Sequence, residues 1–132
     1  MTSIIQNSSP VDVVKAFIAC VRTKDVEHMR KMMHPKATAC LIRENEPHFK
    51  PLAEAIDPLA KAEQELVEVS WDEVEHIDGE YATVWATWSM HWDGELHQLG
   101  SSSYSCWKSP LSGWIILTMS DVARPPNDTV RV

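Results

Sequence analysis

The sequence predicts one α+β domain in which helices pack on one face of a curved antiparallel sheet. Apolar residues recur at helical spacing up to about Glu65, and the pattern changes to strand alternation from Leu66 onward. The 132 residues suit a single domain and suffice to bury a core. Helices followed by a run of long strands are typical of the α+β class.

Two helices are expected at the start of the chain. Ser9 is a good N-cap and Pro10 suits the first helical position. Asp25 can cap a second, shorter helix, which His34-Pro35 should end because a residue before proline avoids the α region. The buried stripe of the first helix is Val14, Phe17, Ile18 and Val21, and that of the second is Val26, Met29 and Met33.

The middle of the chain predicts one strand and a third helix. The apolar segment from Ala37 to Arg43 is followed by turn residues and reads as a strand. Pro51 opens a helical stretch whose apolar residues are Leu52, Ala55, Ile56 and Leu59. Pro58 should break this helix, with Asp57 capping it anew.

Four long strands follow, joined by turns. Asp78-Gly79 and Asp93-Gly94 are strong hairpin signals, and residues 109–113 form a looser turn. The expected strands are Leu66–Ile77, Tyr81–Trp92, Leu96–Lys108 and Trp114–Val122. The domain is expected to span residues 9–125, with an N-terminal tail over 1–8 and a frayed C-terminal tail over 126–132.

Composition excludes several classes of function. A net charge of −7 argues against nucleic-acid binding, which needs a basic face. No apolar run approaches the roughly 20 residues that cross a bilayer, and the first residues lack the basic and apolar regions of a signal peptide. Three cysteines without CxxC spacing favour free thiols in a reducing compartment, so we expect a cytoplasmic protein with no structural metal.

Several short stretches resemble the SnoaL-like branch of the NTF2-like superfamily. They are Met33-His34-Pro35-Lys36-Ala37, Asp78-Gly79-Glu80-Tyr81-Ala82, Val84-Trp85-Ala86-Thr87-Trp88, Asp93-Gly94, Gly100-Ser101-Ser102-Ser103-Tyr104, Gly113-Trp114-Ile115-Ile116 and Ser120-Asp121-Val122-Ala123-Arg124. The resemblance implies a cone with a pocket between helices and sheet, commonly dimerised through the sheet. Its members include ketosteroid isomerases, scytalone dehydratases and polyketide cyclases, so the fold alone does not fix the activity.

Strand parity indicates which side chains face the helices. In the strand from Ala82 to Trp92, the even-numbered residues are all apolar and should face inward. A two-residue Asp93-Gly94 loop would place Met90 opposite His97 and turn Tyr104 outward. A three-residue loop with a bulge would place Trp88 opposite Gln98 and Val84 opposite Ser102, and we favour it because it buries Tyr104.

The last strand is expected to be central or to lie in a dimer contact, because both of its faces are apolar. Trp114, Ile116 and Thr118 would share one face and Ile115, Leu117 and Met119 the other. A single sheet covered by helices on one side also leaves its other face bare, which favours a homodimer.

Asp121 and Tyr104 are the leading catalytic candidates. Asp121 comes near the end of the last strand, and desolvation there would favour its use as a general base. The commoner alternative is an ion pair with Arg124 or a backbone hydrogen bond. Tyr104 can donate a hydrogen bond to a developing enolate oxygen, or it is a core tyrosine with a satisfied hydroxyl. Arg43 either binds a carboxylate or is solvated.

The other histidines and the pocket wall complete the candidate site. His34 is a third catalytic candidate, although a structural role through backbone hydrogen bonds is commoner. His91 and His97 flank a hairpin tip on the outward face and lack further metal ligands, so no metal site is predicted. The expected pocket-lining residues are Trp88, Met90, Val84 and Ser102, which otherwise simply pack the core.

These residues favour a cofactor-independent isomerase, cyclase or dehydratase acting on a small apolar carbonyl compound, such as a polyketide intermediate. Such chemistry needs a base, a donor for the oxygen and exclusion of water. The alternative is a non-catalytic domain that binds a small ligand in the same pocket or dimerises through its sheet. Neither hypothesis includes a membrane or a nucleic acid as partner.

Overall fold

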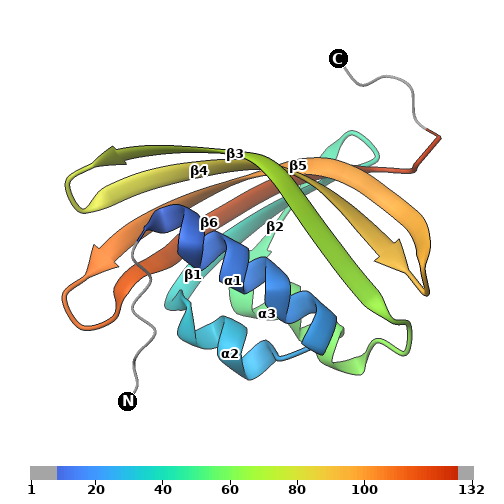
Figure 1. Ribbon diagram of the computed structural model, residues 1–132, viewed down its shortest axis with the longest axis horizontal. Coiled ribbons are helices and arrows are strands. Elements are labelled where there is room, and N and C mark those ends of the chain that lie inside the picture. The colour runs from blue at the N-terminus through green and yellow to red at the C-terminus, as the bar shows by residue number, and fades with distance from the viewer. Residues whose placement is uncertain (1–8, 128–132) are drawn as a thin grey trace.

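A six-stranded sheet curves around the helices in the computed structural model, which describes residues 9–127 (Figure 1). The strands lie in the order β2-β1-β6-β5-β4-β3. Every neighbouring pair is antiparallel except β1 and β6, which run parallel, so the sheet is mixed where an antiparallel one was predicted. The elements are α1 (Pro10–Thr23), α2 (Val26–Lys31), β1 (Met33–Arg43), β2 (Glu46–Pro51), α3 (Leu52–Ile56), a 3₁₀ turn (Asp57–Lys61), β3 (Leu66–Asp78), β4 (Tyr81–Trp92), β5 (Glu95–Ser109) and β6 (Gly113–Arg124).

Helix α1 begins where the sequence predicted. The Ser9 hydroxyl accepts a hydrogen bond from the Asp12 amide at 3.1 Å, and Pro10 occupies the first turn. The helix ends at Thr23, followed by Lys24 in a left-handed conformation. Its apolar face, which includes Phe17 and Ile18, is buried against the sheet. This packing forms one wall of the interior.

Helix α2 is shorter than expected. Asp25 caps it as predicted, accepting from the His28 amide at 3.0 Å, but it ends at Lys31. The Met32 carbonyl instead accepts from the Ile116 amide of β6 at 2.9 Å, and β1 begins at Met33. His34-Pro35 therefore lies within a strand, because β1 already pairs with β6 at Met33, two residues before the proline.

The segment between Arg43 and Leu66 contains one element that the sequence did not indicate. Strand β2 is an exposed edge strand in which polar residues alternate with two prolines and the exposed Phe49, joined to β1 by a tight turn in which Glu44 and Asn45 have positive φ. Helix α3 then ends before Pro58, as predicted, and continues as the 3₁₀ turn. Asp57 does not cap this turn, because its carboxylate pairs with Arg30 of α2.

The β4–β5 hairpin differs from both registers considered above. Asp93 and Gly94 form a two-residue loop with φ of 50° and 84°, so the expected three-residue loop is wrong. One extra residue enters β5 just after the turn, because Met90 pairs with Gln98 whereas His91 pairs with Leu96. This bulge shifts the strand by one residue relative to the simple two-residue hairpin.

The shift restores the inward face that we favoured. Val84 lies opposite Tyr104, and Trp88 lies opposite Gly100, two residues along from the expected partners. Because two residues preserve parity, Tyr104 still points toward the helices and is 4% exposed. The predicted face is therefore correct, and the predicted pairing is not.

A second bulge changes the faces of β6. Cys106 pairs with Ile116, but Ser105 pairs with Thr118, so Leu117 is the extra residue. After Leu117 the inward positions are Met119, Asp121 and Ala123, and Thr118 is exposed. The predicted grouping of Thr118 with Trp114 and Ile116 is therefore wrong, whereas the predicted central position of this strand, between β1 and β5, is confirmed.

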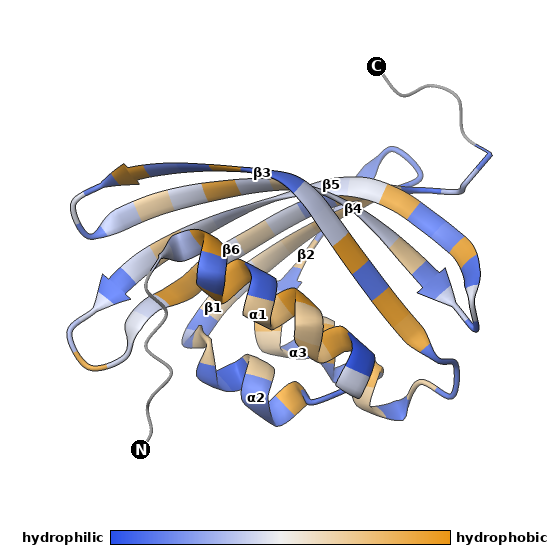
Figure 2. Ribbon diagram, viewed as in Figure 1, coloured by the Kyte–Doolittle hydropathy of each residue, from blue (hydrophilic) through white to orange (hydrophobic). Residues whose placement is uncertain are grey.

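The core lies between α1, α2, α3 and the inner face of the sheet. Hydrophobic and hydrophilic residues alternate along β3 (Figure 2), as expected for a sheet whose faces differ in environment. The cysteines at 20, 40 and 106 are all unpaired thiols. In the described part of the chain, no helix is long and apolar enough to span a membrane.

The outer face of the sheet carries apolar side chains without a cover. Trp71 and Val74 of β3 and Trp85 of β4 are between 40% and 50% exposed. They are neighbours, because Val74 pairs with Trp85 and Trp71 pairs with Thr87. We call Val69, Trp71, Val74, Tyr81 and Trp85 the outer apolar patch.

Candidate functional site

A small cavity of about 140 Å³ lies between the helices and the inner face of the sheet. Its apolar wall comes from all three helices and from Leu41, Met90 and Met119 of the sheet. Five polar side chains share it: Arg43, Glu68, Ser102, Tyr104 and Asp121. An apolar space with a few convergent polar groups is the usual form of a small-ligand site.

Asp121 is held by Arg43. The Arg43 Nη1 donates to Asp121 Oδ1 at 2.7 Å, and Nη2 donates to Oδ2 at 3.4 Å. The strand register explains the pairing, because Leu41 of β1 lies opposite Asp121 and Arg43 is two residues further along the same face. The ion pair that we weighed as the commoner reading of Asp121 is thus present, but its partner is Arg43 rather than Arg124.

Tyr104 points into the same cavity from β5. Its ring lies edge-on to Phe17 of α1, with ring centroids 6.3 Å apart, and its hydroxyl is hydrogen-bonded to Ser102. Burial, with smaller contributions from the charges of Glu68 and Asp121, raises the pKa of Tyr104 well above its ordinary value. The phenol therefore stays protonated and remains a hydrogen-bond donor.

Glu68 of β3 is the cavity residue that sequence reasoning missed. Burial, assisted by the negative charge of Asp121, raises the pKa of its carboxyl to about 8. No hydrogen bond or ion pair to Glu68 occurs within residues 9–127. Glu68 is half-buried and also lines the groove between α1 and β3, and because the pKa of its carboxyl is about 8, it is mostly protonated near neutral pH.

The reason for missing Glu68 lies in the alternation of β3. Val67, Val69 and Trp71 are the apolar set of this strand, and the simple rule turns an apolar set toward the core. In the structure Val69 and Trp71 are exposed on the outer face, and Glu68 shares the inner face with Met90, its partner in β4. A carboxylate alternating with exposed apolar residues is the only signal that the sequence offered.

Four of the seven predicted site residues line the cavity: Asp121, Tyr104, Ser102 and Met90. Val84 and Trp88 are on the same face but are packed in the core, 0% and 4% exposed, outside the cavity lining. His34 is not among the lining residues either. Its Nδ1 accepts from the Lys36 amide, and its ring contacts Trp107.

Trp88 is packed against Gly100 on the neighbouring strand. A Cβ on Gly100 would lie 2.7 Å from Cζ2 of Trp88 and 1.9 Å from the Val122 carbonyl oxygen, so only glycine fits. The Trp88 Nε1 is buried without a hydrogen-bond partner in the described structure. The indole of Trp88 is thus part of the packed core next to the cavity and does not line it.

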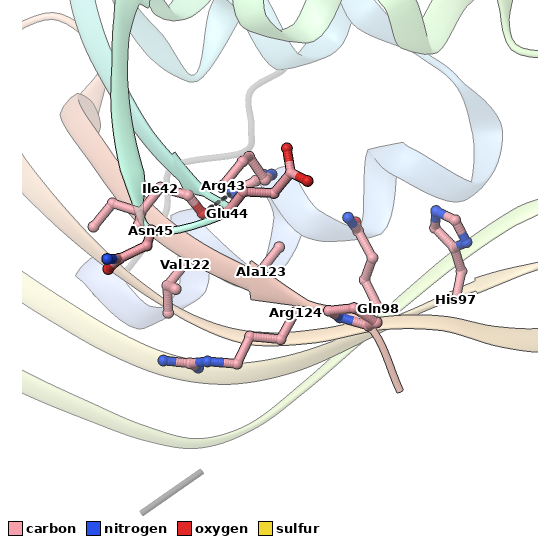
Figure 3. A pocket seen from close by; sticks show the side chains of 10 residues that line it. Ile42, Arg43, Glu44, Asn45, His97, Gln98, Val122, Ala123 and Arg124 are labelled. Carbon is pink, nitrogen blue, oxygen red and sulfur yellow. Dashed lines mark hydrogen bonds between the residues drawn. The ribbon is translucent and has the colours of Figure 1, made fainter. Parts of the chain in front are cut away.

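A larger hollow of about 870 Å³ opens at the end of the sheet (Figure 3). The β1–β2 turn contributes Arg43, Glu44 and Asn45, and β5 contributes His97 and Gln98. Gln98 and His97 project from β5 toward the side where Arg43 and Glu44 lie (Figure 3). Arg43 lines both this space, which we call the mouth hollow, and the inner cavity.

No group of three or more metal-ligating side chains is gathered anywhere in residues 9–127. His97 is stacked on Trp92 with ring centroids 3.5 Å apart. The inner cavity instead offers acid–base groups: an ion-paired carboxylate, a protonated carboxyl and a phenol.

Comparison with solved structures identifies the fold. An NTF2-like protein with a cystatin-like fold from Novosphingobium aromaticivorans superposes with a TM-score of 0.72 at 10% identity, over 90% of this chain and 80% of that one. A candidate dehydratase of the NTF2-like family from Streptomyces avermitilis gives 0.70 at 14%, over 85% and 91%. The beta subunit of a candidate aromatic-ring-hydroxylating dioxygenase from N. aromaticivorans gives 0.70 at 16%, over 96% and 91%.

No protein-family model matches the sequence, and no curated protein sequence matches it. The likeness to solved structures, all at 16% identity or less among those described, establishes architecture and not activity. The chain has the NTF2-like, cystatin-like fold.

Proposed function

We propose that the inner cavity binds the carbonyl part of a small, largely apolar compound and catalyses its isomerisation, cyclisation or dehydration without a cofactor. The observation that carries this proposal is the meeting of Asp121, Glu68 and Tyr104 in one apolar cavity. Paired carboxyl groups in different environments are a common basis for acid–base catalysis.

The charge balance of the inner cavity supports an uncharged group inside it. Arg43 neutralises Asp121, and Glu68, whose pKa is about 8, is mostly protonated at pH 7. A cavity whose formal charges sum to zero does not compensate a charged group for its lost hydration. Tyr104 and protonated Glu68 can both donate hydrogen bonds, which suits a carbonyl oxygen.

The proposed roles follow from these protonation states. Asp121 removes a proton from the carbon next to the carbonyl group, since a carboxylate bound to arginine keeps lone pairs for that purpose. Tyr104 donates a hydrogen bond to the oxygen as negative charge develops there. Glu68 gives its proton to the intermediate, either at another carbon or at a hydroxyl group that departs as water. The proton that Asp121 took then returns to Glu68 through solvent, which restores both groups.

Proton exchange in deuterated buffer tests this proposal without knowledge of the true substrate. Acetophenone and cyclohexanone are incubated with the protein, and loss of the α-proton signal is followed by NMR. Asp121→Asn should lower the rate about 100-fold or more, as expected for loss of a general base. Asp72→Asn, at an exposed position of β3, is the matched control.

A binding domain without catalysis is the second candidate, supported by the mostly apolar wall of the same cavity. It predicts that the ketones raise the melting temperature but that their α-protons exchange no faster than in buffer. That result would remove the catalytic proposal and leave the ligand site.

We also propose that the protein works as a homodimer in the cytoplasm. The outer apolar patch supports association through the sheet, because exposed Trp and Val side chains favour burial against a second copy. The unpaired thiols at positions 20, 40 and 106 support a reducing compartment. We propose as well that the protein belongs to the SnoaL-like branch that its sequence resembles.

A further inference from the structure

The inner cavity and the mouth hollow adjoin along two sides. Arg43 at the end of β1 lines both spaces. Across from it, Met90 of the inner cavity pairs with Gln98 of the mouth hollow on neighbouring strands. A ligand that outgrows the inner cavity would therefore extend between Arg43 and Gln98 into the hollow.

The two spaces differ greatly in size. The inner cavity measures about 140 Å³ and the mouth hollow about 870 Å³. A cavity of roughly 150 Å³ in another protein holds one benzene molecule. The inner cavity thus accommodates about one ring, and the rest of a larger molecule must occupy the hollow.

The two spaces also differ in their polar side chains. Arg43 and Glu44 lie on the side of the mouth hollow toward which Gln98 projects, whereas the Arg124 side chain extends away from them (Figure 3). His97 and Gln98 add side chains that can donate hydrogen bonds. Arg43 is already paired with Asp121, so the hollow has no excess of positive charge. What favours an anionic group there is the set of N–H donors that Arg43, Gln98 and His97 contribute to its lining.

Arg43 retains donors for such a group. A guanidinium has five N–H groups, and the contacts to Asp121 and to the Ile42 carbonyl use three of them. The Arg43 side chain is 33% exposed, whereas the Asp121 side chain is 11% exposed. Arg43 is therefore the member of the pair that a molecule in the hollow can reach.

We propose that the ligand has two parts: an uncharged carbonyl part of about one ring in the inner cavity, and a carboxylate in the mouth hollow against Arg43. This inference rests on the proposed function and adds an anionic end, with a fixed orientation, to its substrate class. Arg43, Gln98 and His97 then determine specificity, whereas Asp121, Glu68 and Tyr104 act on the carbonyl part.

Three probes of graded composition test the inference by calorimetric titration at pH 7. Acetophenone contains only the ring and the carbonyl group. 4-Oxo-4-phenylbutanoate adds a carboxylate on a short chain, and 4-oxo-4-phenylbutanamide replaces that carboxylate by a neutral group of similar size. The carboxylate should bind about ten-fold more tightly than the amide, as expected for a hydrogen bond to a charged group.

Variants in the hollow leave the Arg43–Asp121 pair in place. Gln98→Glu adds a negative charge opposite Arg43 and should abolish or reverse the preference for the carboxylate over the amide. Glu44→Gln removes the acid of the hollow and should increase that preference several-fold. Arg22→Gln removes a cation from the groove between α1 and β3, which shares no lining residue with the mouth hollow, and should leave the ratio unchanged.

The outcomes separate the inference from the proposed function. If acetophenone and the amide bind but the carboxylate binds no more tightly, the anionic end is wrong and the carbonyl site remains. If the preference exists but Gln98→Glu and Glu44→Gln do not change it, the carboxylate binds outside the hollow and the inference is wrong. If no probe binds, both proposals fail together.

Discussion

The guanidinium of Arg43 binds the carboxylate of Asp121 across the parallel pair β1 and β6, with Nη1 2.7 Å from Oδ1. The pair joins the strands that come first and last along the chain, which are neighbours in the sheet, and it lies where the inner cavity and the mouth hollow meet. It fixes the position of the carboxylate that we propose as the base, and it supplies the cation that we propose as the anchor of the ligand.

Removal of either partner should destabilise the fold. Asp121→Asn leaves a partly buried guanidinium without its anion, which should cost about 1–3 kcal/mol of unfolding free energy. Arg43→Gln should cost a similar amount, and the double variant should cost less than the sum by about 1–2 kcal/mol. Urea unfolding of the four proteins at pH 7 measures this coupling.

An exposed ion pair provides the comparison. Arg30 and Glu27 lie three residues apart on α2, with 82% of the Glu27 side chain exposed, so their coupling should stay below about 0.5 kcal/mol. If the coupling energy of Arg43 and Asp121 were no larger than that of Arg30 and Glu27, partial burial would not strengthen the Arg43–Asp121 pair.

The stability of the protein should depend on pH through Glu68. Its pKa is about 8 in the folded chain and 4.5 as an ordinary carboxyl, so the folded state binds a proton that the unfolded state releases between these values. The contribution of Glu68 to stability is therefore complete below pH 4.5 and is lost as the pH rises through 8, with a slope of at most about 1.4 kcal/mol per pH unit.

Glu68→Gln should remove this dependence. Unfolding free energies of both proteins between pH 4 and pH 9 should diverge, with the variant gaining stability relative to the parent as the pH rises. Glu63→Gln, at an exposed position before β3, should follow the parent curve throughout. A constant difference between Glu68→Gln and the parent would contradict the raised pKa.

Local signals allowed much of this fold to be predicted. Ser9 and Asp25 cap helices through contacts three residues away, and Asp93-Gly94 forms a tight turn through its own backbone preference. Pro58 ends α3 by steric exclusion. Each of these effects depends only on neighbouring residues, so the sequence expresses it directly.

The parts that could not be predicted depend on distant partners. Strand β2 alternates polar and apolar residues, but two of its apolar residues are prolines, which argue against a strand, and it is held by pairing with β1. The extra residues of the two bulges, His97 and Leu117, are not of a type that marks a bulge in a sequence. Arg43 was expected to bind a carboxylate or to be solvated, and the structure shows the first, with Asp121 as the partner that the sequence did not name. Glu68 was not singled out.

Gly100→Ala should be among the most damaging small substitutions in the sheet. The added methyl carbon would lie 1.9 Å from the Val122 carbonyl oxygen, which belongs to the backbone of the adjacent strand and cannot rotate away. We expect a loss of about 3 kcal/mol or more of unfolding free energy, or failure to fold. Thermal and urea unfolding measure it directly.

Gly94→Ala separates this steric effect from the general cost of replacing glycine. No atom lies within 4 Å of the position that its Cβ would take, and only its φ of 84° opposes a side chain. Its cost should be about 1 kcal/mol. If Gly100→Ala cost no more than Gly94→Ala, β5 and β6 would be further apart at Gly100 than the structure places them.

The outer apolar patch gives the final prediction, which concerns association. Trp85 is 50% exposed and lies beside Val74, so in a sheet-to-sheet dimer it would be buried against the second copy. Trp85→Lys would place a charge in that contact, and because a two-fold dimer presents the substituted face twice, the same change occurs on both sides. Dimer affinity should fall about thirty-fold or more, the usual loss for a buried tryptophan anchor.

Leu111→Lys introduces the same charge in the β5–β6 turn, where the leucine is 92% exposed, and should leave the dimer intact. Sedimentation equilibrium over a range of concentrations distinguishes these outcomes, with circular dichroism to verify that both variants fold. A parent chain that sediments as a monomer throughout the range, or a dimer indifferent to Trp85→Lys, would show that the patch is not the contact.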